Sequence, residues 1–300
     1  MRPLIVGFGE ALIDKLPSGD VVGGAPLNFS VRSAELGEFF GCDAAIITRI
    51  RRDQHGRQIE ARLQASQLDL SGLQFDQHLP TGFVDVVLNA GQPDYTIGRQ
   101  VAWDAIEFDD AANDLAQRAT VVCFGTLVQL GEVSAATLKK FLVTAKSATK
   151  ILDLNLRKPL PSLAIVEFSL QHADVLKCNL EELQQLAVWF ALKETRDGQA
   201  IASELQQRFE LQAIFWTRGA DGCCWQSGSS CVVAEVPKFE SEPDADSVGA
   251  GDAACAALAI GLVLNWKPER IVMAANLCGA FAASRRGATA PLTDAVLKRA

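Results

Sequence analysis

The segment Asp246–Asp252, with the sequence DSVGAGD, has residue types that could handle a phosphoryl group, and an alanine-rich stretch follows it. Gly249 and Gly251 permit a tight backbone bend that exposes N–H groups. A helix that starts there adds the positive end of its dipole. We therefore expect Gly249, Ala250 and Gly251 to form an anion hole, with the Asp252 carboxylate close enough to accept a proton from an attacking hydroxyl group.

Asp252 is the candidate base of this segment. We expect it in the first turn of a helix, where the dipole should lower the pKa of its carboxyl group. A weak base suits phosphoryl transfer, in which proton removal comes late. The alternative is a plain glycine-rich turn in which Asp252 only stabilises a helix N-terminus.

Two other phosphate-binding motifs are excluded by the surrounding residues. No G-K-[ST] sequence follows the segment, so it is not a Walker loop. Near the N-terminus, Gly7 and Gly9 lack the third glycine of the dinucleotide-binding pattern, because Leu12 stands in its place. We therefore do not expect a nicotinamide cofactor.

Composition indicates a globular protein. The chain has 300 residues, of which 49% are hydrophobic and 21% charged, enough to bury a large core. Its net charge of -8 does not favour DNA, RNA or an anionic membrane surface as a partner. No apolar run reaches the ~20 residues of a membrane span, and no secretory signal is visible. These features predict a cytoplasmic protein.

The eight cysteines are expected to be reduced and buried. No C-x-x-C pair is present and there are only three histidines, so a zinc site is not expected. A chain of this length does not need disulfides to fold, and a cytoplasmic location would keep thiols reduced.

Short apolar runs alternate with helical patterns along most of the chain. Strands are predicted at Leu4–Phe8, Ala44–Thr48, Val121–Phe124, Ile151–Asp153, Val175–Lys177 and Ala213–Thr217. Helices are predicted at Pro26–Leu36, His55–Ala65, Ala135–Ala145, Glu181–Phe190, Gln199–Phe209, Gly251–Val263 and Glu269–Ala283. This alternation predicts an α/β fold, a three-layer sandwich with a mainly parallel central sheet.

Two segments break this rhythm. Residues 11–25 are rich in glycine and contain a proline, and residues 81–105 alternate polar and apolar side chains around a turn at 89–93. Both are typical of short antiparallel strands. We predict that they form a small β-sheet lid, and that residues 1–10, 26–80 and 106–300 form the catalytic core. The alternative is a surface hairpin without a role.

Five segments resemble, in family order, the ribokinase-like (PfkB) carbohydrate kinases. They are Gly23–Asn28, Asp153–Arg157, Asn179–Glu182, Thr217–Gly222 and Asp246–Asp252. Within this family the chain is most similar to bacterial fructokinases, on the evidence of Gly9–Asp14, Pro80–Gly82, Val101–Asp104, Asn276–Ala280 and Gly287–Ala288. The resemblance covers essentially the whole chain and implies a ribokinase-like fold.

The resemblance also implies roles for individual residues. Catalysis is implied for the base Asp252, the anion hole Gly249, Ala250 and Gly251, and the active-site arginine Arg157. Sugar contacts are implied at Asp14, Gly24, Asn28 and Trp103. Nucleotide contacts are implied at Asn179, Thr217, Gly219, Gly222 and Asn276. A Mg²⁺ ion would be organised through water by Asn179 and Glu182, because Mg²⁺ keeps several of its waters.

Some of these residues have a simpler explanation. Asn179 stands where a helix N-cap is expected, and both roles could coexist. Arg157 could be a surface cation, and Trp103 could only pack the lid. The chain also departs from the family pattern at two positions: Ser247 replaces the usual threonine, and Ala254 replaces the usual phenylalanine. Both changes concern the nucleotide side and any nearby K⁺ site.

The implied reaction transfers the γ-phosphate of ATP to a hydroxymethyl oxygen of a hexose, with D-fructose as the first choice. The same family contains kinases for 2-keto-3-deoxygluconate, ribose and nucleosides. A keto acid would need a cation near the sugar, which Arg99 or Arg157 could supply. A sugar-binding or nucleotide-binding regulator without catalysis is the alternative from another class. The resemblance further suggests a homodimer formed through the lid strands.

Overall fold

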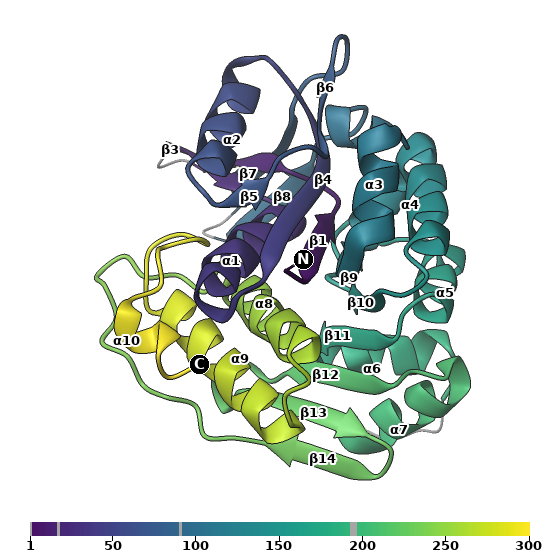
Figure 1. Cartoon of the computed structure of the whole chain (residues 1–300), viewed down its shortest axis with the longest axis vertical. Helices are drawn as coiled ribbons and strands as arrows, with labels where there is room; N and C mark the ends of the chain where they lie inside the picture. The colour runs from purple at the N-terminus through teal and green to yellow at the C-terminus, as the bar shows by residue number, and fades with distance from the viewer. Residues whose placement is uncertain (1, 17–18, 90–91, 193–196) are drawn as a thin grey trace.

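Two β-sheets organise the protein, a ten-stranded central sheet and a separate four-stranded sheet (Figure 1). The structure is a computed structural model that describes residues 2–16, 19–89, 92–192 and 197–300. Helices cover both faces of the central sheet, so the predicted three-layer α/β sandwich is confirmed.

The central sheet is parallel except at one end. Its order is β14-β13-β12-β11-β10-β9-β1-β4-β5, with β6 also paired to β4. The strands are β1 (Leu4–Phe8), β4 (Asp43–Arg51), β5 (Leu68–Asp69), β6 (Leu73–Asp76), β9 (Ala119–Gly125), β10 (Thr149–Asp153), β11 (Val175–Asn179), β12 (Ala213–Thr217), β13 (Cys223–Ser227) and β14 (Ser230–Val233). Only β13 and β14 pair antiparallel. The carboxyl ends of the parallel strands therefore meet at one edge.

Two helical layers bury the sheet. One face carries α1 (Ala25–Phe40), α8 (Ala250–Val263) and α9 (Pro268–Ala283). The other carries α3 (Asp110–Arg118), α4 (Glu132–Thr144), α5 (Leu163–Gln171), α6 (Leu180–Trp189) and α7 (Gly198–Phe209). The remaining helices are α2 (Gln54–Gln64) and the short α10 (Asp294–Leu297). Small side chains along α8 are buried from Ala253 to Gly261, which lets this helix pack closely against the sheet, α1 and α9.

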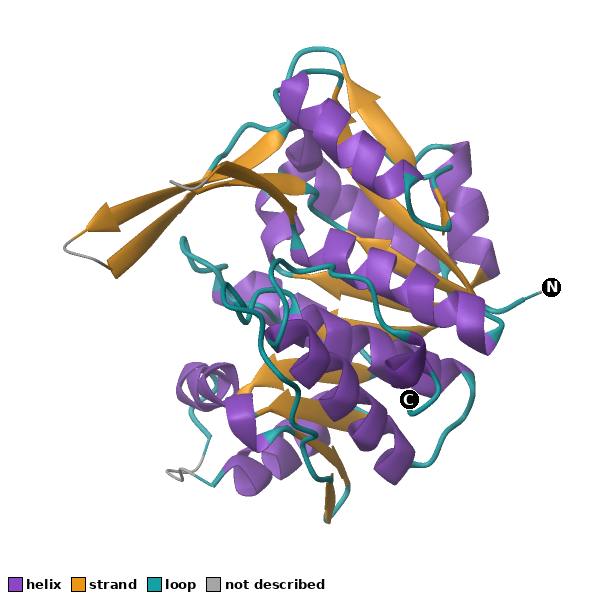
Figure 2. Cartoon of the chain, turned by 90° about the vertical axis from the view of Figure 1, so that its left-hand side faces the viewer, coloured by secondary structure: helices purple, strands orange, loops and turns teal. Residues whose placement is uncertain are grey.

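The two segments that break the α/β rhythm form one small sheet, as predicted. Its order is β3-β2-β7-β8, from β2 (Leu12–Leu16), β3 (Gly19–Gly23), β7 (Gly82–Asn89) and β8 (Gln92–Ile97). Each segment is an antiparallel hairpin, and β2 pairs parallel with β7. The sheet projects away from the sandwich (Figure 2). The predicted turn at 89–93 includes residues 90 and 91, which lie outside the described residues.

Trp103 fastens the small sheet to the core. It lies in the short 3₁₀-helix Ala102–Ala105 and is fully buried among Leu12, Val84 and Leu127. A Cβ atom at Gly82 would lie 1.9 Å from the indole ring, so only glycine leaves room for it. Trp103 is therefore a packing residue at the root of the small sheet and offers no exposed surface to a ligand in this structure.

The prediction that all cysteines are reduced is wrong for one pair. Cys224 of β13 and Cys231 of β14 form a disulfide, while the six other cysteines are free and buried. The hairpin that brings the pair together was not predicted, and neither were α3, α5, α10, β5 and β6. All of these elements are short, between two and nine residues long.

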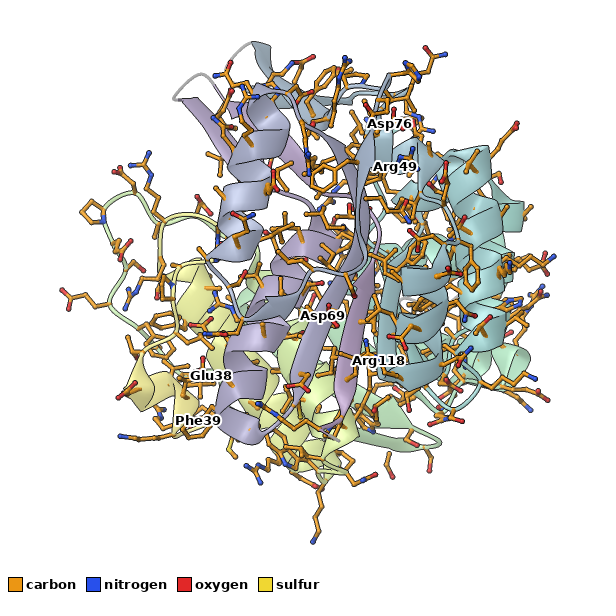
Figure 3. The ribbon with its side chains drawn as sticks, turned by 45° about the horizontal axis from the view of Figure 1, so that its top comes forward. Glu38, Phe39, Arg49, Asp69, Asp76 and Arg118 are labelled. Carbon is orange, nitrogen blue, oxygen red and sulfur yellow. A yellow bond between two sulfur atoms is a disulfide. The ribbon has the colours of Figure 1, made fainter. Side chains whose placement is uncertain are left out.

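An ion pair with little exposure fixes the segment of chain that leads into the small sheet. Arg49 of β4 donates from Nε to Oδ2 of Asp76 at 2.9 Å, and the two side chains lie side by side in Figure 3. The other Asp76 oxygen accepts the backbone N–H groups of His78 and Leu79, which fixes the loop that leads to β7. Arg118 and Asp69 form a comparable pair at the surface (Figure 3).

Removing each arginine in turn should show that the Arg49–Asp76 pair stabilises the fold more than the Arg118–Asp69 pair. The Arg49 side chain is 14% exposed and that of Arg118 is 39% exposed. Arg49→Met leaves a buried carboxylate without its cation and should lower the free energy of unfolding by about 3 kcal/mol. Arg118→Met should cost less than about 1 kcal/mol. Urea denaturation measures both, and equal losses would contradict the role of Arg49.

Candidate active site

The candidate anion hole lies at the N-terminus of α8. Gly249 is the N-cap residue with φ 77°, in the left-handed region, and no side chain caps the helix. A Cβ atom at Gly249 would also lie 2.5 Å from the carbonyl oxygen of Ala288. Glycine is therefore required both by conformation and by close packing. Gly249, Ala250 and Gly251 turn the start of α8 as the sequence predicted, and Asp252 follows in the first turn.

Asn28 orients the candidate base. Its side-chain amide donates from Nδ2 to Oδ2 of Asp252 at 2.9 Å. Asn28 is 4% exposed, and its own Oδ1 has no partner among the described residues. It lies in the first turn of α1. The N-cap residue of this helix is Gly24, which has φ 108°, and because it lacks a Cβ atom the Glu10 carbonyl oxygen can approach closely. The predicted residues Gly24, Asn28 and Asp252 are thus brought together.

The expected direction of the Asp252 pKa is wrong. Burial raises the pKa of Asp252 to about 6, although the positive charge of Lys177 and the Asn28 hydrogen bond lower it. Loss of hydration disfavours the carboxylate more than these contacts favour it. Asp252 is therefore a stronger base than its place in the helix suggested, and it is still mostly ionised at neutral pH.

Lys177 and Asp153 form a buried ion pair that the sequence analysis did not identify as part of the site. Lys177 of β11 stands opposite Asp153 of β10, and its Nζ lies 2.8 and 3.0 Å from the two carboxylate oxygens. A Cβ atom at Gly251 would lie 3.2 Å from Lys177 Nζ. The ammonium group therefore lies directly against the first turn of α8. A lysine within the apolar run of β11 was the available signal.

Glu10 is a third charged residue missed by the sequence analysis. It follows β1 and is 3% exposed, and its Oε2 has no partner among the described residues. Burial raises the pKa of Glu10 to about 8, with further raising by the charges of Asp252 and Asp153 and lowering by Arg157. With Asp153 and Asn155 it lines a narrow cavity at the carboxyl ends of the strands. Glu10 is thus a neutral acid at neutral pH.

Asp14 of the small sheet, a predicted sugar contact, and Arg157 of the loop after β10, the predicted active-site arginine, lie close enough for their charges to interact. Asp14 lies within β2, and its carboxylate occupies the space that a Cβ atom at Gly23 would fill. Burial raises the pKa of Asp14, while the positive charge of Arg157 lowers it. Arg157 is exposed and forms no ion pair with any described residue; its guanidinium group donates to the Leu156 carbonyl oxygen. Its charge also acts on Asp252.

Asn179 and Glu182 form a capping box at the start of α6. The Asn179 side chain accepts from the Glu182 N–H, and Glu182 Oε2 accepts from the Asn179 N–H. The other Glu182 oxygen accepts from the Leu156 N–H. Each Glu182 oxygen accepts one backbone N–H group and keeps a lone pair for a water molecule. Binding of Mg²⁺ through water by this pair stays a prediction. Burial raises the pKa of Glu182.

The predicted nucleotide-side residues lie beyond β12. Thr217 ends that strand and pairs with Asn179, while Gly219 is exposed in the turn that follows. Gly222 has φ 76°, and a Cβ atom there would meet the side chain of Asn276. Asn276 accepts from the Cys223 N–H and donates to the Ala234 carbonyl oxygen. It therefore holds two segments of chain together.

The two departures from the family pattern are placed clearly. Ser247 is exposed in the loop before α8, and Ala254 is 2% exposed within α8. A Cβ atom at Gly279 of α9 would lie 3.7 Å from the Ala254 Cβ. The small residue at 254 thus belongs to the close contact between α8 and α9.

The arrangement can be compared with what a metal ion and a phosphate group need for binding. Across the described parts of the chain, no three His, Cys, Asp or Glu side chains gather as a metal site. The uncapped N-terminus of α8, with the Lys177 ammonium against Gly251, suits a phosphate group.

In the described parts of the chain, no helix has the length and apolar character that crossing a membrane requires.

Comparison with known proteins gives the class to which this site belongs. A family model described as pfkB family carbohydrate kinase matches residues 19–295. The chain therefore belongs to the pfkB family of carbohydrate kinases.

Three individual relatives share between 24% and 28% sequence identity with this chain. Fructokinase-1 of Oryza sativa subsp. japonica is 28% identical over 98% of this chain and 95% of its own length. The structure of a sugar kinase from Pyrococcus horikoshii in complex with ATP is 27% identical, with a TM-score of 0.80 over 98% of this chain and 97% of that chain. A fructokinase from Xylella fastidiosa with bound ATP has a TM-score of 0.83 at 24% identity over 99% and 98% of the two chains, which shows the shared fold.

Glu10→Gln should remove a pH-dependent cost of folding. The pKa of Glu10 is about 8 in the folded protein and ordinarily 4.5. Between these values the unfolded chain loses the Glu10 proton while the folded chain keeps it, so the wild-type protein loses stability as the pH rises. Glutamine cannot ionise. The stability of the variant relative to wild type should therefore increase by up to about 1.4 kcal/mol per pH unit from pH 5 to 8.

Glu38→Gln is the matched control, because Glu38 is exposed on α1 and points into solvent (Figure 3). Its stability difference from wild type should not change with pH. Denaturant unfolding at several pH values measures both variants. A Glu10→Gln difference that is constant over this range would show that Glu10 is ionised in the folded protein.

Proposed function

We propose that the protein is an ATP-dependent hexose kinase that phosphorylates a hydroxymethyl oxygen, most specifically that of D-fructose to give fructose 6-phosphate. The observation that carries the proposal is the Asn28–Asp252 hydrogen bond beside the uncapped N-terminus of α8. In the proposed mechanism, this oriented carboxylate would stand next to the phosphate group that the start of α8 binds. Membership of the carbohydrate kinase family and the similarity to a plant fructokinase support it.

Asp252 acts as the base in this proposal. As the hydroxymethyl oxygen forms its bond to the γ-phosphorus, the bond from that phosphorus to the β-phosphate oxygen breaks and ADP leaves. The hydroxyl proton passes to Asp252, whose pKa of about 6 lets it be ionised and yet still basic at neutral pH. The N–H groups of Gly249 and Gly251 would face the charge that accumulates on the transferred group. The Ala250 N–H donates to the Ser247 carbonyl oxygen in this structure and would have to exchange that contact to take part.

The remaining parts of the site bind and shield the substrates. Asp14 and Asn28 would hold sugar hydroxyls, and the small sheet formed by residues 11–25 and 81–105 would close as a lid that excludes water. Thr217 and Gly219 would face the nucleotide. Mg²⁺, held through water near Asn179 and Glu182, would supply positive charge to the phosphates. Activation by K⁺ and a cytoplasmic location stay predictions.

The lid strands also support the proposed homodimer. β3 and β8 end the small sheet, and each has one edge without a partner strand in the described chain. Pairing with a second copy would cover these edges.

Asp252→Asn should abolish most of the turnover while sugar binding is kept. We expect kcat to fall by about 10²–10⁴-fold, measured as ADP release with Mg²⁺-ATP and fructose, and calorimetric sugar binding close to wild type. For the wild-type enzyme, kcat/KM should fall as the pH drops through about 6, because the base becomes protonated. Asp244→Asn, an exposed aspartate in the loop before α8, should be unaffected. Near-normal turnover of Asp252→Asn would refute the assignment, and sugar binding without any turnover by the wild-type protein would favour a regulator.

A keto acid such as 2-keto-3-deoxygluconate is the second candidate substrate. The observation that favours it is the exposed Arg157, which has no acidic partner among the described residues, whereas Arg99 is already paired with Asp104 at 3.1 Å. A guanidinium group without a partner could bind the substrate carboxylate.

Arg157→Met separates the two substrates. If the keto acid is the substrate, this variant should raise its KM by at least about 10-fold, because a charged hydrogen bond is lost. With fructose the change should be small. Lys158→Met is the control, since it removes an adjacent exposed cation. Assays of both sugars, with ribose and a nucleoside added to the panel, identify the preferred substrate. A preference for ribose or a nucleoside would contradict both candidates.

A further inference from the structure

Burial of the Lys177–Asp153 ion pair costs free energy of folding. Both side chains are less than 10% exposed, at 9% and 8%. Asp153 ends β10 and Lys177 lies within β11, and the neighbouring buried positions of both strands are largely apolar. Taking two charges out of water costs several kcal/mol each, and their attraction seldom exceeds that cost by much. Two apolar residues would stabilise this part of the sheet at least as well. Stability of the fold therefore does not explain why a charged pair stands at this position.

The pair lies directly under the candidate anion hole. The 3.2 Å between Lys177 Nζ and the position of a Gly251 Cβ atom brings the ammonium group against the α8 backbone, one residue before Asp252. A larger residue at 251 would displace the ammonium group. Glycine at this position thus serves the approach of a charge from the sheet as well as the bend of the loop.

Several charged or titratable groups face this region from the surrounding elements. The Asp252 carboxylate comes from α8 and experiences the Lys177 charge more strongly than that of any other residue. The other groups that interact with Lys177, Asp252 or their neighbours are Glu10 after β1, Cys123 on β9, Asp153 on β10, Arg157 after β10, Cys178 on β11, Glu182 on α6, Cys223 on β13 and Cys255 on α8. Lys177 and Arg157 are the cations of this set, and of these two only Lys177 is buried.

We propose that Lys177 and Asp153 are positioning residues that act together on the base: the Lys177 ammonium under Gly251 favours the ionised form of Asp252, and Asp153 limits that effect. The inference rests on the proposed function, in which Asp252 accepts the proton. Lysine alone would make Asp252 too weak a base, and no lysine would leave it protonated at neutral pH. The pair holds the base between these limits.

Single substitutions at the two residues should move the pH profile in opposite directions. Lys177→Met removes the positive charge, so the acid limb of kcat/KM should move up by about one pH unit or more. Asp153→Asn removes the opposing negative charge, so the acid limb should move down. The double variant Asp153→Asn/Lys177→Met should lie between the two. A pair with a purely structural role would lower activity in both single variants and leave the limb in place.

Two further measurements keep the test decisive. Lys177→Arg keeps the charge and should restore most of the wild-type pH profile. The ionisation of Asp252 can also be followed without any substrate, as the infrared carboxylate band that is present in wild type and missing in Asp252→Asn. Its midpoint should shift up in Lys177→Met and down in Asp153→Asn, even if no sugar is turned over.

The outcomes distinguish failure of the inference from failure of the proposed function. Absence of turnover on every sugar, together with opposite infrared shifts, would refute the kinase assignment and retain the electrostatic coupling. Unchanged infrared midpoints and acid limbs in both single variants would overturn the inference. If Lys177→Met does not fold, Asp153→Asn and the double variant decide: the inference then requires a downward shift in the first and a smaller shift in the second.

Discussion

The hydrogen bond from Asn28 to Asp252 is the contact on which the site depends. It joins two residues 224 positions apart in the chain, one in the first turn of α1 and one in the first turn of α8. Both helices lie on the same face of the central sheet and pack against each other. The carboxylate is therefore oriented by the packing of the whole helical layer, and any shift between α1 and α8 changes where it points.

Desolvation dominates the chemistry of the groups around this contact. Burial raises the pKa values of Glu10, Asp14, Glu182 and Asp252, and in each case burial is the largest cause. The site thus gathers acids where water is scarce, and it opposes their mutual repulsion with Lys177 inside and Arg157 at the rim. Such an arrangement suits a reaction that brings in further negative charge on phosphate groups, because the cations are already in place.

Much of the fold could be predicted from the sequence because its signals are local. Apolar runs with the right length gave the bounds of β1 and β12, and the glycine-rich segment before an alanine-rich stretch marked the start of α8 within one residue. The candidate site was predicted from short motifs: Asp153, Asn179 and Thr217 end strands, whereas Asp252 follows a long loop after β14. Asn179 shows how far this goes, since its capping role follows from a spacing of three residues.

The failures all depend on tertiary packing. The pKa of Asp252 was expected to fall because the helix terminus is visible in the sequence, whereas the burial that raises it is not. Lys177 and Glu10 were missed because a charged residue in an apolar run shows no partner until neighbouring strands are aligned. The Cys224–Cys231 disulfide requires a hairpin that the pattern of residues 223–233 did not predict. Trp103 packs against Gly82, and its contact with a sugar stays a prediction.

The dense packing of α8 has a consequence for how this enzyme can change. From Ala253 to Gly261 the helix has no exposed residue, so nearly every substitution along it would enlarge a side chain in a filled space and push the helix, with Asp252 at its end, out of place. Evolution or engineering of a new substrate range would therefore have to proceed elsewhere. The small sheet and the exposed segment around Arg157 are the parts of the site where side chains can be exchanged without moving the base.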